Sequence, residues 1–218
     1  MKSAPAQETT GAPLDAHAVR ADFPIFAREI GGRPLAFLDS AASAQKPRQV
    51  LDAMERLYAW SYANVHRGVY PLSAEATEAY EGVRPIVQRV LNASSTREVI
   101  FTRNATEALN LVAYSWGRAN VGPGDVIVAT ELEHHSNLVP WQVLAEATGA
   151  TLRFLRMDDE GVLDLSALDA IAAEGPVRLL AVGEQSNALG TINPIARLAA
   201  WVPGQGGVIV VDGAQSVP

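Results

Sequence analysis

The sequence predicts an α/β fold in which helices cover both faces of a mainly parallel, doubly wound sheet. From residue 98 onwards, short apolar runs typical of strands alternate with segments whose apolar residues recur at helical spacing. The last run, Val208–Val211, has four largely β-branched apolar residues, which indicates a strand buried on both faces. Polar residues follow several of these runs directly, at the strand ends where ligands bind in open α/β sheets.

The first hundred residues carry a less regular pattern. Residues 1–18 are small, polar and rich in Pro, Ala and Thr, so we expect a disordered tail there. A turn with two glycines precedes a predicted short strand, Leu35–Asp39. Apolar residues at helical spacing predict a helix over Gln49–Tyr62. A second helix is expected over Ser73–Leu91, with Ser73 as its cap and a kink at Pro85.

The remaining elements follow in alternation, with helices or loops linking one strand to the next. Such an arrangement places parallel strands side by side in one sheet. We therefore predict that residues 19–218 belong to one large domain with no internal repeat or linker. The expected strands are Glu98–Thr102, Val126–Ala129, Thr151–Leu155, Val177–Val182 and Val208–Val211, and the expected helices are Thr106–Trp116, Pro140–Ala147, Leu165–Ala173 and Ile195–Val202.

Composition excludes several classes of function. Of the 218 residues, 48% are hydrophobic and 19% are charged, as in an ordinary globular protein. The net charge is −7 and no segment concentrates Lys and Arg with aromatics, which argues against nucleic acid and anionic membranes as partners. The chain contains no cysteine, and we expect no metal centre. It shows neither a signal peptide nor an apolar run of roughly 20 residues, so we expect a cytoplasmic protein.

Four polar segments follow predicted strands, and three of them have both a functional and a simpler interpretation. The start of the helix after Arg103 offers free N–H groups and a Thr hydroxyl for a phosphate, or else it is a plain helix cap. His134 suits stacking on an aromatic cofactor or carrying protons. Asn187 either donates to a ligand oxygen or closes an Asx-turn. Asp212 either pairs with a protonated ring nitrogen or caps the turn that follows it.

Taken together, the four segments favour one cofactor. A phosphate cradle, an imidazole, an amide donor and an acid at successive strand ends match pyridoxal 5'-phosphate (PLP) better than a dinucleotide. The one glycine-rich run near a strand, Gly204–Gly207, precedes its strand, whereas the phosphate loop of a dinucleotide fold follows one.

Six segments resemble, in order, the amino-terminal half of a SufS-type cysteine desulfurase, in the class V aminotransferase group of fold type I PLP enzymes. They are FLDSAASAQKP, YANVHRGVYPLSAEATEAYEGVR, FTRNATEALNLVAYSWG, ELEHHSNLVPWQ, SNALGTINP and VVDGAQSVP. The resemblance implies a PLP-binding large domain. It also implies an enzyme that converts L-cysteine to L-alanine and holds the sulfur as a persulfide for iron–sulfur cluster assembly.

The resemblance also implies the roles of individual residues. The expected cofactor contacts are Ala105 and Thr106 on the phosphate, His134 on the ring face, Asn187 and Gln215 on the phenolic oxygen, and Asp212 on the ring nitrogen. His134 and Asp212 are the expected catalytic residues. Four further residues are expected on the substrate side or at the interface of a homodimer: Ala41, Ala42, His66 and Arg67. A sulfur-acceptor protein is the expected further partner.

Two departures from the family pattern bear on function. Gly183-Glu184-Gln185 stands where the family usually has Thr-His-x, which adds a charge near the site. The family's Ser-x-His-Lys segment, whose Lys bonds PLP, its sulfur-carrying cysteine and its small domain are expected beyond Pro218. We therefore expect the 218-residue chain alone to be inactive. A selenocysteine lyase, another class V enzyme and a non-catalytic fragment or pseudoenzyme are the alternatives.

Overall fold

The computed structural model describes residues 14–217. The chain forms two compact units, Met1–Val99 and Ile100–Pro218, and each is described by itself. Within the described residues, every helix is too short or too polar to cross a membrane. The expectation of a single large domain over residues 19–218 stays a prediction.

The first unit begins with helix α1 (Ala16–Ala21), which lies partly inside the expected tail. Asp15 caps it, because Oδ1 of Asp15 accepts the backbone N–H groups of His17 at 3.0 Å and Ala18 at 3.1 Å. Helical structure therefore starts three residues before the expected boundary at residue 19, while residues 1–13 of the expected tail lie outside the described residues. A short turn, η1 (Pro24–Ala27), and a hairpin of β1 (Glu29–Ile30) and β2 (Arg33–Pro34) follow.

Two helices form most of the rest of this unit, as expected. Helix α2 (Arg48–Arg56) widens into a π-type turn, η2 (Leu57–Ser61), and helix α3 (Pro71–Val90) contains Pro85. Helix α3 begins before Ser73, so the prediction that Ser73 is the cap was wrong. The Ser73 side chain is buried instead, where its hydroxyl donates to the carbonyl of Asn64 at 2.7 Å and accepts from the N–H of Gly68 at 3.0 Å.

Two expected strands, Leu35–Asp39 and Glu98–Thr102, do not form. A strand needs a neighbour for its backbone groups, and these segments bond elsewhere. The Leu35 carbonyl accepts from the Arg20 guanidinium at 2.8 Å. A 3₁₀ turn, η3 (Thr96–Glu98), occupies the start of the second segment, and the next carbonyl, that of Val99, accepts from the Arg84 guanidinium at 2.6 Å.

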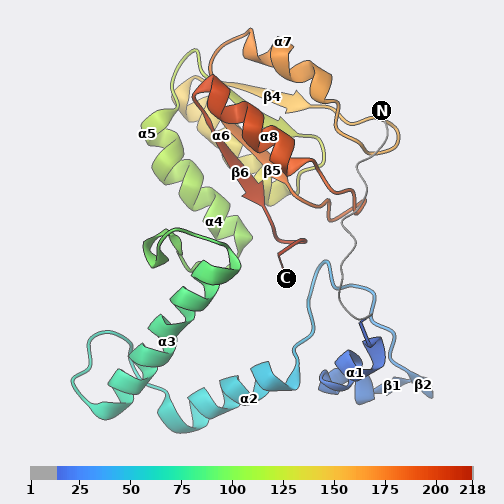
Figure 1. Ribbon diagram of the computed structural model, residues 1–218, viewed down its shortest axis with the longest axis vertical. Coiled ribbons are helices and arrows are strands. Elements are labelled where there is room, and N and C mark those ends of the chain that lie inside the picture. The colour runs from blue at the N-terminus through green and yellow to red at the C-terminus, as the bar shows by residue number, and fades with distance from the viewer. Residues whose placement is uncertain (1–13, 218) are drawn as a thin grey trace. The chain divides into compact units, whose positions relative to one another are not determined.

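The second unit is built on a four-stranded parallel sheet with the order β4-β3-β5-β6 (Figure 1). The strands are β3 (Val126–Thr130), β4 (Thr151–Leu155), β5 (Val177–Gly183) and β6 (Val208–Asp212), within one residue of the expected bounds. The predicted fold class, a mainly parallel sheet with flanking helices, is confirmed.

Helices cover both faces of this sheet, so it is doubly wound. One face packs Ile127, Leu179 and Ala181 against Leu109 and Trp141, from the layer of α4 and α6. The other face packs alternate strand residues against the layer of α7 and α8. The helices and turns of this unit are α4 (Ala105–Val112), η4 (Ala113–Gly117), α5 (Arg118–Asn120), η5 (His135–Asn137), α6 (Val139–Thr148), η6 (Leu165–Ala167), α7 (Leu168–Ala172), α8 (Ile195–Trp201) and η7 (Val202–Gln205).

Strand β6 differs from its expectation in one respect. It lies at the edge of the sheet and pairs only with β5 among the described residues, and Val208 and Val211 are each 37% exposed. A β-branched apolar run predicts a strand but does not tell whether that strand lies at the centre or at the edge of the sheet. The prediction that this strand is buried on both faces was therefore wrong. The fully covered strand is β3, at the centre of the sheet.

Candidate functional site

Hydrogen bonds join three of the four predicted polar segments at the carboxyl ends of β3, β5 and β6. The N–H of Gly183, the last residue of β5, donates to Oε1 of Glu133 at 2.9 Å. The next N–H, that of Glu184, donates to the carbonyl of Asp212 at 2.9 Å, and the hydroxyl of Ser216 donates to Oε2 of Glu184 at 2.6 Å. The predicted meeting of these segments at one sheet edge therefore occurs in the structure.

His134 stands exposed on the loop between β3 and α6. Its Nδ1 accepts the backbone N–H of Ser136 at 3.2 Å and lies 2.7 Å from the hydroxyl of the same serine. Because Nδ1 accepts a backbone N–H, this arrangement places the proton of the neutral ring on Nε2. The ring of His135 lies 6.0 Å away and nearly edge-on, so the two imidazoles point differently.

Asp212 ends β6 and performs the turn-capping role that the sequence left open. Its Oδ1 accepts the N–H of Ala214 at 3.0 Å. Its Oδ2 accepts no hydrogen bond from any residue in the described part of the chain, so the cap leaves one carboxylate oxygen for a ligand. Gln215 is half-buried in the same turn, which closes through the bond from the N–H of Ser216 to the carbonyl of Gly213 at 3.1 Å.

Asn187 does not close an Asx-turn. The turn after β5 is made by Ser186, whose hydroxyl oxygen accepts the N–H groups of Ala188 at 3.3 Å and Leu189 at 3.2 Å. The N–H of Gly190 also bonds the carbonyl of Ser186 at 2.9 Å. The Asn187 side chain is exposed and makes no hydrogen bond within residues 14–217, so its amide remains available.

The start of α4 is both a capped helix and an exposed donor site. Oδ1 of Asn104 accepts the N–H of Glu107 at 2.9 Å, which is the plain cap that the sequence left open. Helix geometry leaves the N–H groups of Ala105 and Thr106, both exposed residues, without an intrahelical acceptor. The Arg103 guanidinium donates to Glu107 and lowers the pKa of that carboxyl, while the pKa of Arg103 is raised in turn.

A buried polar cluster beneath these residues was not anticipated from the sequence. Glu133 accepts from the hydroxyl of Thr130 at 2.6 Å and from the amide of Asn137, whose own oxygen accepts from the indole of Trp141 at 3.0 Å. Burial raises the pKa of Glu133, and the nearby Asp212 charge adds to the increase. Hydrogen bonds from Thr130, Gly183 and Asn137 oppose it.

A second buried side chain, that of Asn193, fixes the loop after β5. Its amide nitrogen donates to the carbonyl of Gly183 at 2.7 Å, and its backbone N–H donates to the carbonyl of Glu184 at 2.8 Å. Its Oδ1 is buried and has no hydrogen-bond partner within residues 14–217. The sequence signal for Glu133 was its position just after an apolar strand, whereas Asn193 lies ten residues beyond the end of β5 and had no such signal.

The residues expected on the substrate side all lie in the first unit. Ala41 and Ala42 are exposed, in a turn where the N–H of Ala42 bonds the carbonyl of Asp39 at 3.2 Å. His66 has a φ of +72° and its N–H donates to the hydroxyl of Thr77 at 2.9 Å. Arg67, the next residue, is exposed. Because the structure describes the two units separately, the proximity of these four residues to the second unit stays a prediction.

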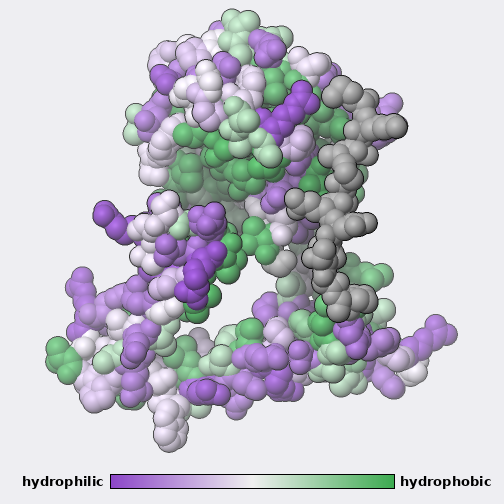
Figure 2. Space-filling view, in the orientation of Figure 1, coloured by the Kyte–Doolittle hydropathy of each residue, from purple (hydrophilic) through white to green (hydrophobic). Residues whose placement is uncertain are grey.

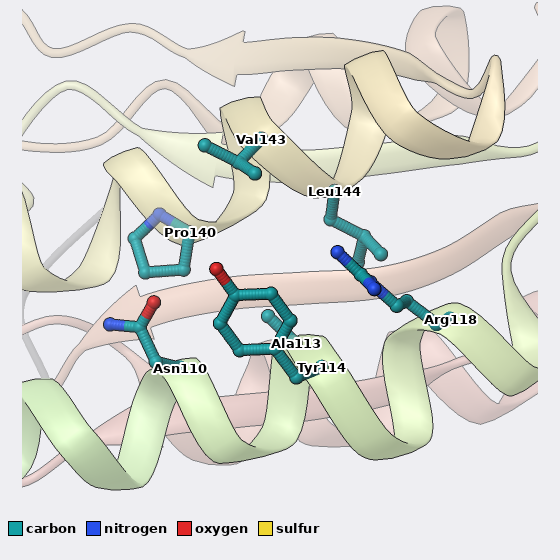
Figure 3. A pocket seen from close by; sticks show the side chains of 7 residues that line it. All are labelled: Asn110, Ala113, Tyr114, Arg118, Pro140, Val143 and Leu144. Carbon is teal, nitrogen blue, oxygen red and sulfur yellow. The ribbon is translucent and has the colours of Figure 1, made fainter.

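The second unit also has a shallow pocket between α4–α5 and α6, drawn in Figure 3. The Arg118 guanidinium lies 4.7 Å from the centre of the Tyr114 ring there. No residue of the predicted site lines this pocket, which is a surface groove between two helices. Its lining residues are Asn110, Ala113, Tyr114, Arg118, Pro140, Val143 and Leu144.

The part of the chain that the structure describes contains no group of three His, Asp or Glu side chains able to hold a metal ion. The donors gathered at the sheet edge are instead an imidazole, carboxylates, amides and hydroxyls. This set suits an organic ligand that has hydrogen-bonding groups and a protonated ring nitrogen, and the free N–H groups at the start of α4 suit a negative group.

Comparison with known proteins identifies close relatives. The cysteine desulfurases of Enterobacter sp. (strain 638) and Pectobacterium atrosepticum are 53% and 51% identical to this chain over 199 residues, which is 91% of the chain and 49% of each relative. The chain thus spans about half the length of the curated relatives it matches.

Solved structures show the same likeness. The apo cysteine desulfurase of Thermococcus onnurineus NA1 superposes with a TM-score of 0.83 at 41% identity, over 92% of this chain and 48% of that one. The cysteine desulfurase CsdA of Escherichia coli superposes with a TM-score of 0.75 at 35% identity, over 92% and 49%. The aminotransferase class-V family model matches residues 36–218, and the chain belongs to that family.

Proposed function

We propose that this chain is the PLP-binding part of a cysteine desulfurase, which converts L-cysteine to L-alanine and holds the sulfur as a persulfide for iron–sulfur cluster assembly. The observation that carries the proposal is the junction of three strand ends. There an exposed imidazole, His134, and an aspartate with one unbonded oxygen, Asp212, occupy loops tied together by hydrogen bonds. The names of the relatives support the choice of substrate.

The residues present fit PLP. The N–H groups of Ala105 and Thr106 and the Thr106 hydroxyl stand at the positive end of α4, where a phosphate binds well. Oδ2 of Asp212 can accept a hydrogen bond from a protonated ring nitrogen, and the imidazole of His134 can lie on a ring face. The side-chain amides of Asn187 and Gln215 would donate hydrogen bonds to the phenolic oxygen of PLP.

Bound PLP would supply an electron sink for the amino acid's α-carbon. The Asp212 carboxylate of this chain would hold a proton on the ring nitrogen by its negative charge, and the same charge raises the pKa of the nearby Glu133 carboxyl. The chain has no cysteine, so the thiolate that receives sulfur would come from outside these 218 residues.

We further propose L-cysteine, a second copy of the protein and a sulfur-acceptor protein as partners, in the cytoplasm, with Ala41, Ala42, His66 and Arg67 on the substrate side or at the interface between copies. Non-glycine residues with positive φ, such as His66, are concentrated at functional sites. The first unit also exposes large apolar side chains, including Trp60 at 81%, and Figure 2 shows apolar surface on the chain. Apolar surface of this kind marks interaction sites.

Two experiments test the proposal. The first titrates the 218-residue chain with PLP and follows absorbance, comparing wild type with Thr106→Val and Asp212→Asn. We expect measurable binding that both variants weaken.

The second joins this chain to the carboxyl-terminal half of the Enterobacter relative and measures alanine from L-cysteine, with L-selenocysteine in parallel. Absence of PLP binding and of alanine formation would overturn the proposal, and turnover of selenocysteine alone would reassign the substrate.

A further inference from the structure

The carboxylate of Glu133 uses both oxygens to hold parts of the fold that are distant in sequence. Oε1 accepts from the Thr130 hydroxyl at the end of β3 and from the Gly183 N–H at the end of β5, at 2.6 and 2.9 Å. Oε2 accepts from the amide of Asn137. Thr130 is 1% exposed and Asn137 is fully buried, so water does not compete for these donors.

The cluster continues from Glu133 into the helix layer. The oxygen of Asn137 accepts from the indole N–H of Trp141 at 3.0 Å, and the Trp141 side chain is fully buried in the core against β3 and β5. The loop that carries His134 is therefore tied through one carboxylate to two strands and, through Asn137, to α6. Its neighbour Glu131 faces the other way, where its carboxylate accepts the N–H of Met157 beyond β4 at 3.2 Å.

We propose that Glu133 is a positioning residue that clamps the His134 loop to the end of β5 and so holds the His134 ring over the candidate cofactor site. The clamp is local because Glu133 and His134 are adjacent and Gly183 directly precedes Glu184, which bonds Asp212. The ring's own contact with Ser136 then sets its rotation. The importance of this position for PLP rests on the proposed function, whereas the clamp itself does not.

The geometry requires a carboxylate at this position. Three donors converge on two oxygens, and each oxygen acts only as an acceptor when the group is ionised. A glutamine would turn an NH₂ group either towards the Asn137 amide or towards the Gly183 N–H and the Thr130 hydroxyl. The Asn137 amide cannot simply reverse, because its oxygen already serves the Trp141 indole. Glu133→Gln therefore keeps the shape but places donor against donor.

The three hydrogen bonds of this cluster lower the pKa of Glu133, but burial outweighs them. Burial raises its pKa and the Asp212 charge, at the end of β6, adds to the increase. Glu131, His134 and His135 are the other titratable groups on its own loop, and Asp212 is the charged group that acts on it from the end of β6. A half-buried acid held by three hydrogen bonds is costly to place, which supports a positional role for it.

Glu133→Gln in the 218-residue chain tests the proposal, with Glu131→Gln as the matched control from the same loop. Histidine labelled with ¹⁵N reports the His134 ring without any ligand, with its signals assigned through His134→Phe. We expect wild type and Glu131→Gln to show one tautomer with unprotonated Nδ1. In Glu133→Gln we expect averaged tautomers and a PLP affinity about tenfold weaker, with thermal unfolding retained.

The outcomes separate the clamp from the proposed function. Unchanged His134 signals in a folded Glu133→Gln variant would overturn the clamp. If that variant does not fold, Thr130→Val removes one donor at almost constant volume, and it must shift the His134 signals in the same direction or the clamp is wrong. If the His134 signals change but wild type binds no PLP, the clamp stands and the proposed function fails.

Discussion

The hydroxyl of Ser216 donates to Oε2 of Glu184 at 2.6 Å, and this bond joins the loop after β5 to the turn after β6. Both segments carry candidate cofactor contacts, since Asn187 follows Glu184 by three residues and Gln215 directly precedes Ser216. The backbone reinforces the connection through the bond from the Glu184 N–H to the Asp212 carbonyl at 2.9 Å. Glu184, the charge that departs from the family pattern, thus acts within the site as a structural link.

We expect Ser216→Ala to loosen the turn that carries Gln215. The lost hydrogen bond should lower the free energy of unfolding by about 1 kcal/mol and weaken PLP binding by a few-fold. Denaturant unfolding and PLP titration of the 218-residue chain measure the two effects. Ser166→Ala is the control, because it removes a bond of equal length, to Asp164 at 2.6 Å, on the exposed surface away from the site. Equal PLP affinity in both variants would contradict the link.

PLP bound to the 218-residue chain should not become covalently attached in stoichiometric amounts. The chain has two lysines, Lys2 and Lys46, and the Lys46 ammonium donates to the carbonyl of Ala44 in the first unit. Borohydride treatment followed by mass spectrometry tests this expectation. The Enterobacter relative treated in parallel is the positive control. One fixed PLP per chain at Lys46 would show that the candidate site has been placed wrongly.

The stability of the chain should depend on pH through Glu133. Its pKa in the folded state is raised above the ordinary value of 4.5, so between these two pKa values the folded state binds more protons than the unfolded state. The contribution of Glu133 to the free energy of unfolding is therefore fully present below pH 4.5 and is lost as pH rises through the folded pKa. Urea unfolding across this range, wild type minus Glu133→Gln, should show a difference that falls with pH. A difference that rises would refute the assigned pKa direction.

The two central strands of the second unit could be predicted well because their residues face a core on both sides. Val126–Thr130 and Val177–Val182 are almost wholly buried, and a short apolar run bounded by turns reports such burial directly. Glu98–Thr102 has a similar pattern but no neighbouring strand, and pairing is a tertiary property that the local sequence does not contain. The partly exposed edge position of β6 was missed for the same reason.

The candidate site, too, could be predicted only in part from the sequence. Strand ends and resemblance identified His134, Asn187 and Asp212, and the structure joins their loops. The sequence did not reveal Glu133, because an acid in ELEHHSN looks like a solvated charge until Thr130, Asn137 and Gly183 are seen to surround it. Nor did it show that Ser186, rather than Asn187, closes the turn, since both side chains are capable of it.

Asp212 has two roles in the structure and the proposal, and two substitutions separate them. Oδ1 caps the turn through the Ala214 N–H, whereas Oδ2 is the oxygen assigned to the ring nitrogen of PLP. Asp212→Asn keeps an oxygen for the cap and removes the charge, while Asp212→Ala removes both. We expect the cap to be worth about 1 kcal/mol, so the alanine variant alone should unfold more easily.

In the protein joined to the carboxyl-terminal half of the Enterobacter relative, both variants should lose turnover by about 100-fold, because a fixed charge has its largest effect where charge develops during the reaction. PLP affinity should change much less, since Ala105, Thr106 and the other contacts remain. Alanine formation from L-cysteine and PLP titration measure the two quantities. If the asparagine variant retains wild-type turnover while the alanine variant fails, Asp212 acts through the turn alone and its assignment to the ring nitrogen is wrong.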